Sequence, residues 1–246
     1  MKAILLFVAA LSFAAAPFMT TGFDGFDPTR YPIPQYDPPV QPAGYAFSIW
    51  GIIYVWLVIH AGFSLFKRDV DRDWDAPRWW LFASLTVGTS WLSVATFSPF
   101  WATVLIWFML ITALVALFRA PVRDPWLGAA PLALYAGWLS AASLVSVGML
   151  GAGYGVLFGQ IGWAYASIVA ASTIAICVQL ALGRAPLYGA GVVWGLIAIA
   201  VQNGAEQISV TVIALLGAAL VAAAALGTAR RPKGASTPNS STTQPK

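Results

Sequence analysis

The sequence is poor in charge: only 9% of its 246 residues are Asp, Glu, Lys or Arg. Soluble domains carry about 25% charged residues, because a surface that faces water needs them. Several stretches of about twenty residues contain no charged residue at all, which is typical of helices surrounded by lipid. The composition therefore excludes a soluble enzyme, and a hydrophobic content of 59% also excludes a disordered chain.

The residue types that build catalytic and metal sites are scarce as well. The single cysteine, Cys177, excludes a disulfide framework and a cysteine-built metal site. The sequence contains no Walker loop, no dinucleotide-binding fingerprint and no HExxH pair, and no predicted membrane span holds an acidic or basic residue in its interior. We therefore expect neither an ion-coupled pump nor an enzyme, and we predict no metal site.

His60 is the only histidine, and two interpretations of it are open. Its imidazole could be an axial ligand of a haem or a chlorin. Alternatively, it forms a hydrogen bond between helices near the inner membrane interface. Because no second ligand accompanies it, the sequence favours the hydrogen-bonded histidine.

Eight apolar segments predict an all-α, polytopic bundle of transmembrane helices. About 20 helical residues, at a rise of 1.5 Å each, cross the roughly 30 Å of membrane hydrocarbon. The segments are 3–20, 44–66, 79–98, 100–118, 126–147, 155–182, 186–201 and 207–228. Pro131 lies inside the fifth segment and is expected to kink it. The first segment also resembles a cleaved secretory signal, which would leave seven spans, but Pro17 after Ala16 favours a retained helix.

The basic residues indicate the topology. Twelve of the 13 Lys and Arg residues fall on one side of an alternating eight-span arrangement, and only Arg30 falls on the other. Because Lys and Arg in short loops stay in the cytoplasm, both termini are predicted to be cytoplasmic. The net charge of +4 is thus explained by topology, and no nucleic-acid partner is expected.

Two further segments lie outside the predicted spans. The outer connection 21–43 carries six prolines, which make it stiff and extended. It is either a lid across the outer helix ends or a spacer, and composition does not decide between the two. The polar tail after Arg230 is predicted to be disordered and cytoplasmic.

The twelve tryptophans divide into two groups. Several lie at helix ends and fit the interfacial aromatic belt. Five others come from five different helices and fall at a common depth in the outer half of the membrane: Trp50, Trp91, Trp107, Trp163 and Trp194. Tyr54, Tyr135 and Trp138 follow slightly deeper. This layer either lines a pocket for a flat apolar ligand or packs helix against helix, and both readings remain open.

Specific motifs in this layer resemble a known family. Pro42-Ala-Gly-Tyr45-Ala-Phe47-Ser-Ile-Trp50-Gly-Ile-Ile-Tyr54 and Pro131-Leu-Ala-Leu-Tyr135-Ala-Gly-Trp138-Leu-Ser-Ala-Ala are similar to the tryptophan-rich sensory proteins, the TspO and translocator-protein relatives. The segment Tyr188-Gly-Ala-Gly-Val-Val-Trp194 resembles the extra helices of their longer bacterial members.

The resemblance implies a five-helix core over 1–150, three additional helices over 151–228 and a cytoplasmic tail over 229–246. It also implies residence in the bacterial inner membrane and a sensory or binding protein for a flat hydrophobic ligand, such as a bound tetrapyrrole or a lipid. The ligand-binding residues carried over from the family are Tyr45, Phe47, Trp50, Tyr54, Trp91, Tyr135 and Trp138. An uncoupled facilitator of such a ligand, a structural subunit of a larger membrane complex and a homodimer also stay open.

Overall fold

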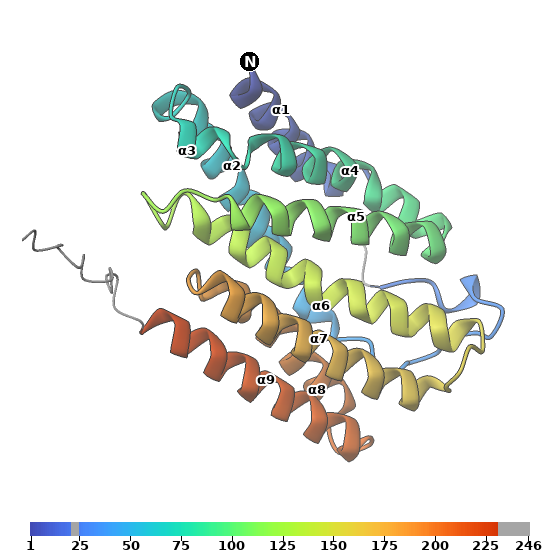
Figure 1. Ribbon diagram of the computed structural model, residues 1–246. Helices are drawn as coiled ribbons and strands as arrows, with labels where there is room; N and C mark the ends of the chain where they lie inside the picture. The colour runs from blue at the N-terminus through green and yellow to red at the C-terminus, as the bar shows by residue number, and fades with distance from the viewer. Residues whose placement is uncertain (21–24, 231–246) are drawn as a thin grey trace, which may run out of the picture.

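The computed structural model describes residues 1–20 and 25–230, and within these ranges the chain is all-α (Figure 1). The long helices are α1 (Lys2–Ala15), α2 (Ile49–Lys67), α4 (Arg78–Phe97), α5 (Pro99–Phe118), α6 (Ala129–Gly153), α7 (Gln160–Leu182), α8 (Leu187–Asn203) and α9 (Ile208–Ala229). The short helical segments are α3 (Arg72–Asp75) and the 3-10 turns η1 (Ala16–Met19), η2 (Pro28–Arg30) and η3 (Gly44–Ser48).

The predicted spans correspond to the eight long helices of the described chain, and each helix end lies within six residues of its predicted position. Seven helical segments of the described chain are long and apolar enough to cross a membrane, and α8 is shorter, at 17 residues. A helix satisfies its own backbone polar groups, which lipid cannot do, so apolar composition and helical structure coincide here. The predicted kink at Pro131 is wrong. α6 begins at Ala129, so this proline lies in the first turn, where a backbone N–H has no helical partner to lose.

Five helices form a closed ring. α1 packs against α2 and α4, α4 packs against α5, and α6 closes the ring by contacting both α5 and α2. On its other side α6 packs against α7 and α8, which are themselves covered by α9 (Figure 1). α6 is therefore the central helix of the bundle, and nearly all of its residues are buried.

α6 and α8 approach each other closely because glycines face the crossing. A Cβ atom at Gly137 would collide with the backbone carbonyl of Tyr188, and one at Gly191 would press on the backbone of α6. Small residues allow such close packing of membrane helices. The Tyr188 hydroxyl is buried at this crossing, 3.0 Å from the Ser140 hydroxyl.

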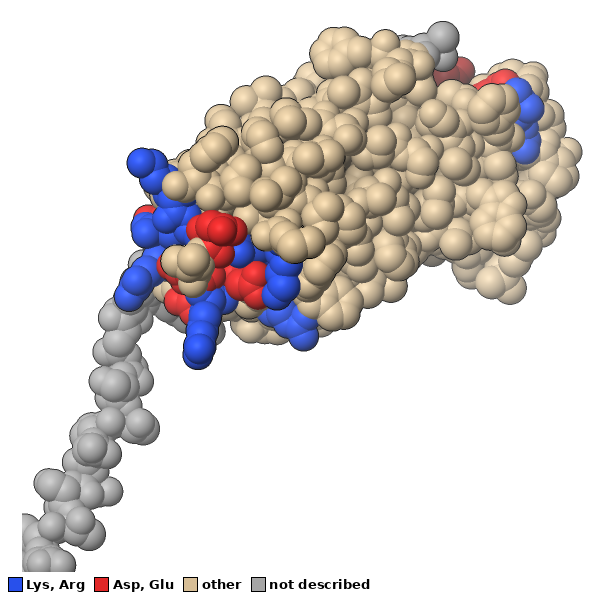
Figure 2. Space-filling model, turned by 90° about the horizontal axis from the view of Figure 1, so that it is seen from above, with Lys and Arg blue, Asp and Glu red and all other residues tan. Residues whose placement is uncertain are grey.

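Charged side chains gather at the end of the bundle where the described chain starts and ends (Figure 2). There, Lys2 pairs with Asp75 at 2.6 Å and Arg68 pairs with Asp124 at 2.8 Å. The buried Arg78 donates to the backbone carbonyls of Ser64, Arg68 and Asp69, which closes the C-terminal end of α2. Arg30, near the opposite end, has a local partner in Asp27.

Candidate aromatic cavity and its strap

Residues 25–43, here called the strap, lie across the ends of α6, α7 and α8 that are opposite the charged end of the bundle. The backbone N–H of Ile33 donates to the carbonyl of Gly153 at 2.9 Å, and that of Ala43 donates to the carbonyl of Ala198 at 3.1 Å. The structure therefore favours a lid over a loose spacer for this part of the connection. Residues 21–24 lie outside the described chain.

Side chains add two further bonds between the strap and the helices. The buried Asn203, at the end of α8, donates to the carbonyl of Pro39 at 2.8 Å. Gln160, at the start of α7, donates to the side-chain oxygen of Gln35 at 3.1 Å. Of these four bonds, one joins the strap to α6 and three join it to α7 or α8. The helices beyond the five-helix ring therefore contribute most of the attachment.

The strap approaches α6 at two glycines. A Cβ atom at Gly153 would collide with the Tyr31 ring, and one at Gly148 would lie 3.1 Å from the Val40 side chain. Tyr31 and Val40 are both almost fully buried by this contact. Hydrophobic burial thus adds to the hydrogen bonds in fixing the strap.

An apolar cavity of about 50 Å³ lies beneath the strap, between the ring and α8. Its walls come from the strap, η3, α4, α5, α6 and α8. The lining residues are Gly25, Phe26, Gln41, Pro42, Phe47, Trp91, Ile106, Trp138, Ala141, Ala142, Val145, Ser146, Met149, Gly195 and Ile199.

Three of the predicted ligand-binding residues line this cavity: Phe47, Trp91 and Trp138. The Phe47 and Trp138 rings meet edge to face, with centroids 6.1 Å apart. The Trp91 indole donates its N–H to the carbonyl of Ala102 at 2.8 Å, which fixes the ring across α4 and α5. The Trp138 N–H is buried and has no hydrogen-bond partner among the described residues.

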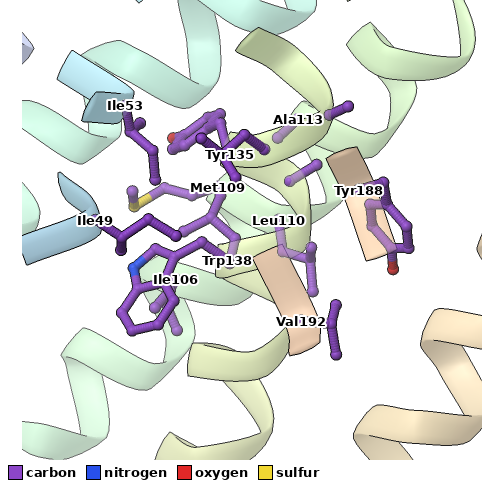
Figure 3. Close-up of a cluster of buried hydrophobic side chains, with 14 of the residues drawn as sticks. Ile49, Ile53, Ile106, Met109, Leu110, Ala113, Tyr135, Trp138, Tyr188 and Val192 are labelled. Carbon is purple, nitrogen blue, oxygen red and sulfur yellow. The ribbon is translucent and has the colours of Figure 1, made fainter. Parts of the chain in front are cut away.

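Three other predicted residues form an aromatic cluster that adjoins Trp138. Trp50 stacks on Tyr54, with ring centroids 5.4 Å apart, and its edge contacts Trp138 at 6.2 Å. Tyr135 is fully buried in the hydrophobic cluster of Figure 3. Its hydroxyl lies 2.8 Å from the Ser84 hydroxyl. Phe13 of α1 lies among Trp50, Tyr54 and Tyr135 and contacts all three rings. These rings support the cavity wall from behind.

The seventh predicted residue, Tyr45, lies apart from the cavity. Its side chain is 45% exposed and meets the edge of Trp194 at 5.5 Å. The Trp194 indole in turn donates to the carbonyl of Ala46 at 2.9 Å. This pair joins η3 to α8, and its position supports the packing interpretation for Trp194.

The remaining tryptophans of the outer layer also pack rather than line the cavity. Trp163 donates to the carbonyl of Val156 at 2.7 Å and fills the space above Gly151. Trp107 is half-buried against the core. The common depth of the five tryptophans therefore does not give them a common role.

Several cavity residues were missed by the sequence reasoning, among them Phe26, Gln41 and Gly195. Gly25 has φ +132°, a conformation open to glycine, and a Cβ atom there would lie 2.9 Å from the Gln41 side chain. Gly25, Phe26 and Gln41 also border a more polar hollow of about 350 Å³ on the outer side of the strap. They therefore separate the cavity from the outside, and no motif in the sequence signals this.

His60 takes the less specialised of its two predicted roles. The His60 Nδ1 atom lies 2.7 Å from the carbonyl of Leu127, and its ring stacks on Trp74. His60 is thus hydrogen-bonded, as the sequence favours, but its partner lies in the α5–α6 connection rather than in a second helix. Cys177 is an exposed free thiol on α7, a helix that packs between α6 and α9.

The helical bundle, its apolar surface and the aromatic cavity define an integral membrane protein with a ring of five helices and three more beside it. The sequence matches the family described as TSPO-like protein over residues 4–227. No curated protein and no solved structure matches the chain. Because the match extends over nearly the whole chain, the protein belongs to the TSPO-like family, as its motifs indicated.

Proposed function

We propose that the protein binds a flat hydrophobic ligand, such as a tetrapyrrole or a lipid, in the cavity under the strap, and that it acts as a binding or sensory protein rather than as an enzyme. The observation that carries this proposal is the cavity itself, whose walls are almost entirely apolar and include Phe47, Trp91 and Trp138. Aromatic walls stack on flat ligands, and concave apolar sites between helices are common ligand sites.

One polar group supports a ligand that carries a hydrogen-bond acceptor. The Trp138 N–H is buried beside the cavity and lacks a partner among the described residues. Buried donors are nearly always satisfied in folded proteins. A ligand whose acceptor reached this N–H once the cavity had widened would satisfy it.

The cavity of the described structure is small. Pockets for drug-sized ligands have volumes of about 300–1,000 Å³, far more than the 50 Å³ found here. A tetrapyrrole therefore enters only if the strap moves outward from α6 and α8. The energy that holds the strap closed reduces the apparent affinity, because only the open fraction of the protein binds.

The orientation follows from the charges. We infer that the basic end of the bundle faces the cytoplasm and that the strap faces the opposite side of the bacterial inner membrane. The ligand would then reach the cavity from outside the cytoplasm, past Gly25, Phe26 and Gln41.

Porphyrin titration of the purified protein tests the proposal. Binding is followed by the porphyrin's own absorbance band, so that removing a tryptophan does not change the signal. Trp91→Ala and Trp138→Ala are expected to weaken binding, and Trp101→Ala, at an exposed outer helix end, serves as the control. If both cavity variants bind porphyrin as the parent does, the cavity assignment is wrong.

A further inference from the structure

A second groove lies at the basic end of the bundle, far from the strap. It has a volume of about 270 Å³ and lies between the α5–α6 connection and the α7–α8 connection. Its apolar walls include Val122, Trp126 and Leu187, and Arg184 is the one charged residue among the described residues that line it. All of its lining residues lie in these connections or in the first turns of α6 and α8, which is the level of the lipid headgroups.

Arg184 makes no ion pair with any described residue. Within the described chain its Nη2 atom alone forms hydrogen bonds, to the backbone carbonyls of Leu117 and Phe118 at 3.4 Å and of Ala120 at 3.0 Å. Burial lowers the pKa of the guanidinium from its ordinary value, because the charge is partly removed from water. Arginine nevertheless stays protonated in proteins, so the groove holds a positive charge without a described counter-ion.

The acid nearest in sequence to the groove wall is already engaged. Asp124 accepts two hydrogen bonds from Arg68, at 2.8 and 3.0 Å. Arg119, which lies over the Trp80 ring, and Arg123 also make no ion pair within the described chain. Within the described chain, therefore, the guanidinium of Arg184 is held by the backbone carbonyls at the C-terminal end of α5 and has no carboxylate partner.

The helices add to this positive field. α6 begins at Ala129 and α8 begins at Leu187, and both residues line the groove. The N-terminal end of a helix carries a partial positive charge, which favours a nearby anion. This contribution reinforces that of Arg184.

We propose that this groove binds an anionic phospholipid of the cytoplasmic leaflet, with its phosphate at Arg184 and its glycerol and upper acyl chain against the apolar wall. A free phosphate ion would use the charge but not the wall of Val122, Trp126 and Leu187. Trp126 suits a lipid neighbour because it is 68% exposed at interfacial depth and its ring stacks on Trp56.

Native mass spectrometry of the full chain, equilibrated with equal amounts of phosphatidylglycerol and phosphatidylcholine, tests the site. The parent is expected to retain phosphatidylglycerol preferentially. Arg184→Gln should weaken that retention about fivefold, because the phosphate loses its charged partner in the groove. Arg72→Gln, an exposed arginine at the same end without an ion pair in the described chain, should leave it unchanged.

A second variant separates the lipid site from a structural effect of losing Arg184. Val122→Trp fills the groove but keeps the charge, and it should weaken retention as well, whereas Val70→Trp, at a 96% exposed position of the same end, should not. Retention by both groove variants at the parent level would overturn the proposal. Loss in Arg184→Gln alone, or displacement of the lipid by excess inorganic phosphate, would show a simple anion site and would also overturn it.

Discussion

Replacing Asn203 with alanine should loosen the strap without unfolding the bundle. The Asn203 side chain donates at 2.8 Å to Pro39 in the strap and at 2.8 Å to the carbonyl of Ile199 in its own helix, and it is only 5% exposed. Its removal leaves the Pro39 carbonyl without this donor. An unsatisfied buried group costs about 1–3 kcal/mol.

The effect should be local, because other contacts hold the helices in place. Asn203→Ala keeps the backbone bonds that its carbonyl accepts from Glu206 and Gln207. The strap keeps the Ala43 bond to Ala198 and the burial of Tyr31. We therefore expect the free energy of strap opening, rather than that of global unfolding, to fall by about 1–3 kcal/mol.

Hydrogen exchange measures this directly. The Gln41 and Ala43 amides both donate backbone bonds, to Pro38 and Ala198. Their exchange should accelerate about 5- to 150-fold in Asn203→Ala, the factor that corresponds to 1–3 kcal/mol. Gln202→Ala, an exposed neighbour, is the matched control and should exchange like the parent. Unchanged protection of both amides in Asn203→Ala would refute the anchoring role, and so would equal acceleration throughout α6.

Three further predictions concern packing and topology. Gly137→Ala should lower the stability of the protein in detergent by about 1–3 kcal/mol, because the new methyl group meets the Tyr188 carbonyl. Gly51→Ala places its methyl group in open space and should leave the stability unchanged. Equal melting temperatures for Gly137→Ala and the parent would contradict the close α6–α8 crossing. Tyr188→Phe should cost only about 0.6 kcal/mol, the average worth of a hydrogen bond between membrane helices, and a double variant with Ser140→Ala should cost little more. In a Cys177→Ser background, a cysteine introduced at Tyr36 should react with an impermeant thiol reagent added to whole cells, and one introduced at Val70 should not. The reverse labelling would contradict the predicted topology.

The membrane helices could be read from the sequence because lipid imposes one simple rule. An apolar run of sufficient length must be helical, so the spans and the one-sided distribution of Lys and Arg followed without tertiary information. The position of Pro131 shows the limit of this reasoning. Its effect depends on where α6 begins, and helix ends are the least certain part of a hydropathy pattern.

The site was predicted less completely, for a physical reason. Motifs near η3 and in α6 identified Phe47 and Trp138 because aromatic residues at those positions resemble the family. Depth alone could not show that Tyr45 and Trp194 pack on each other, since depth does not tell which way a side chain points. The anchoring of the strap depends on bonds between distant polar residues such as Gln35 and Gln160, which leave no periodic signal.

The most direct test of the central claim is to fill the cavity. Ala142 lines it and is half-buried, and Ala142→Phe would place a ring where the ligand is proposed to lie. Ala219→Phe, on the exposed face of α9, adds the same ring elsewhere. In a porphyrin titration of well-folded proteins, Ala142→Phe should weaken binding by about tenfold or more, while Ala219→Phe should match the parent. Parent-like binding by Ala142→Phe would contradict the account.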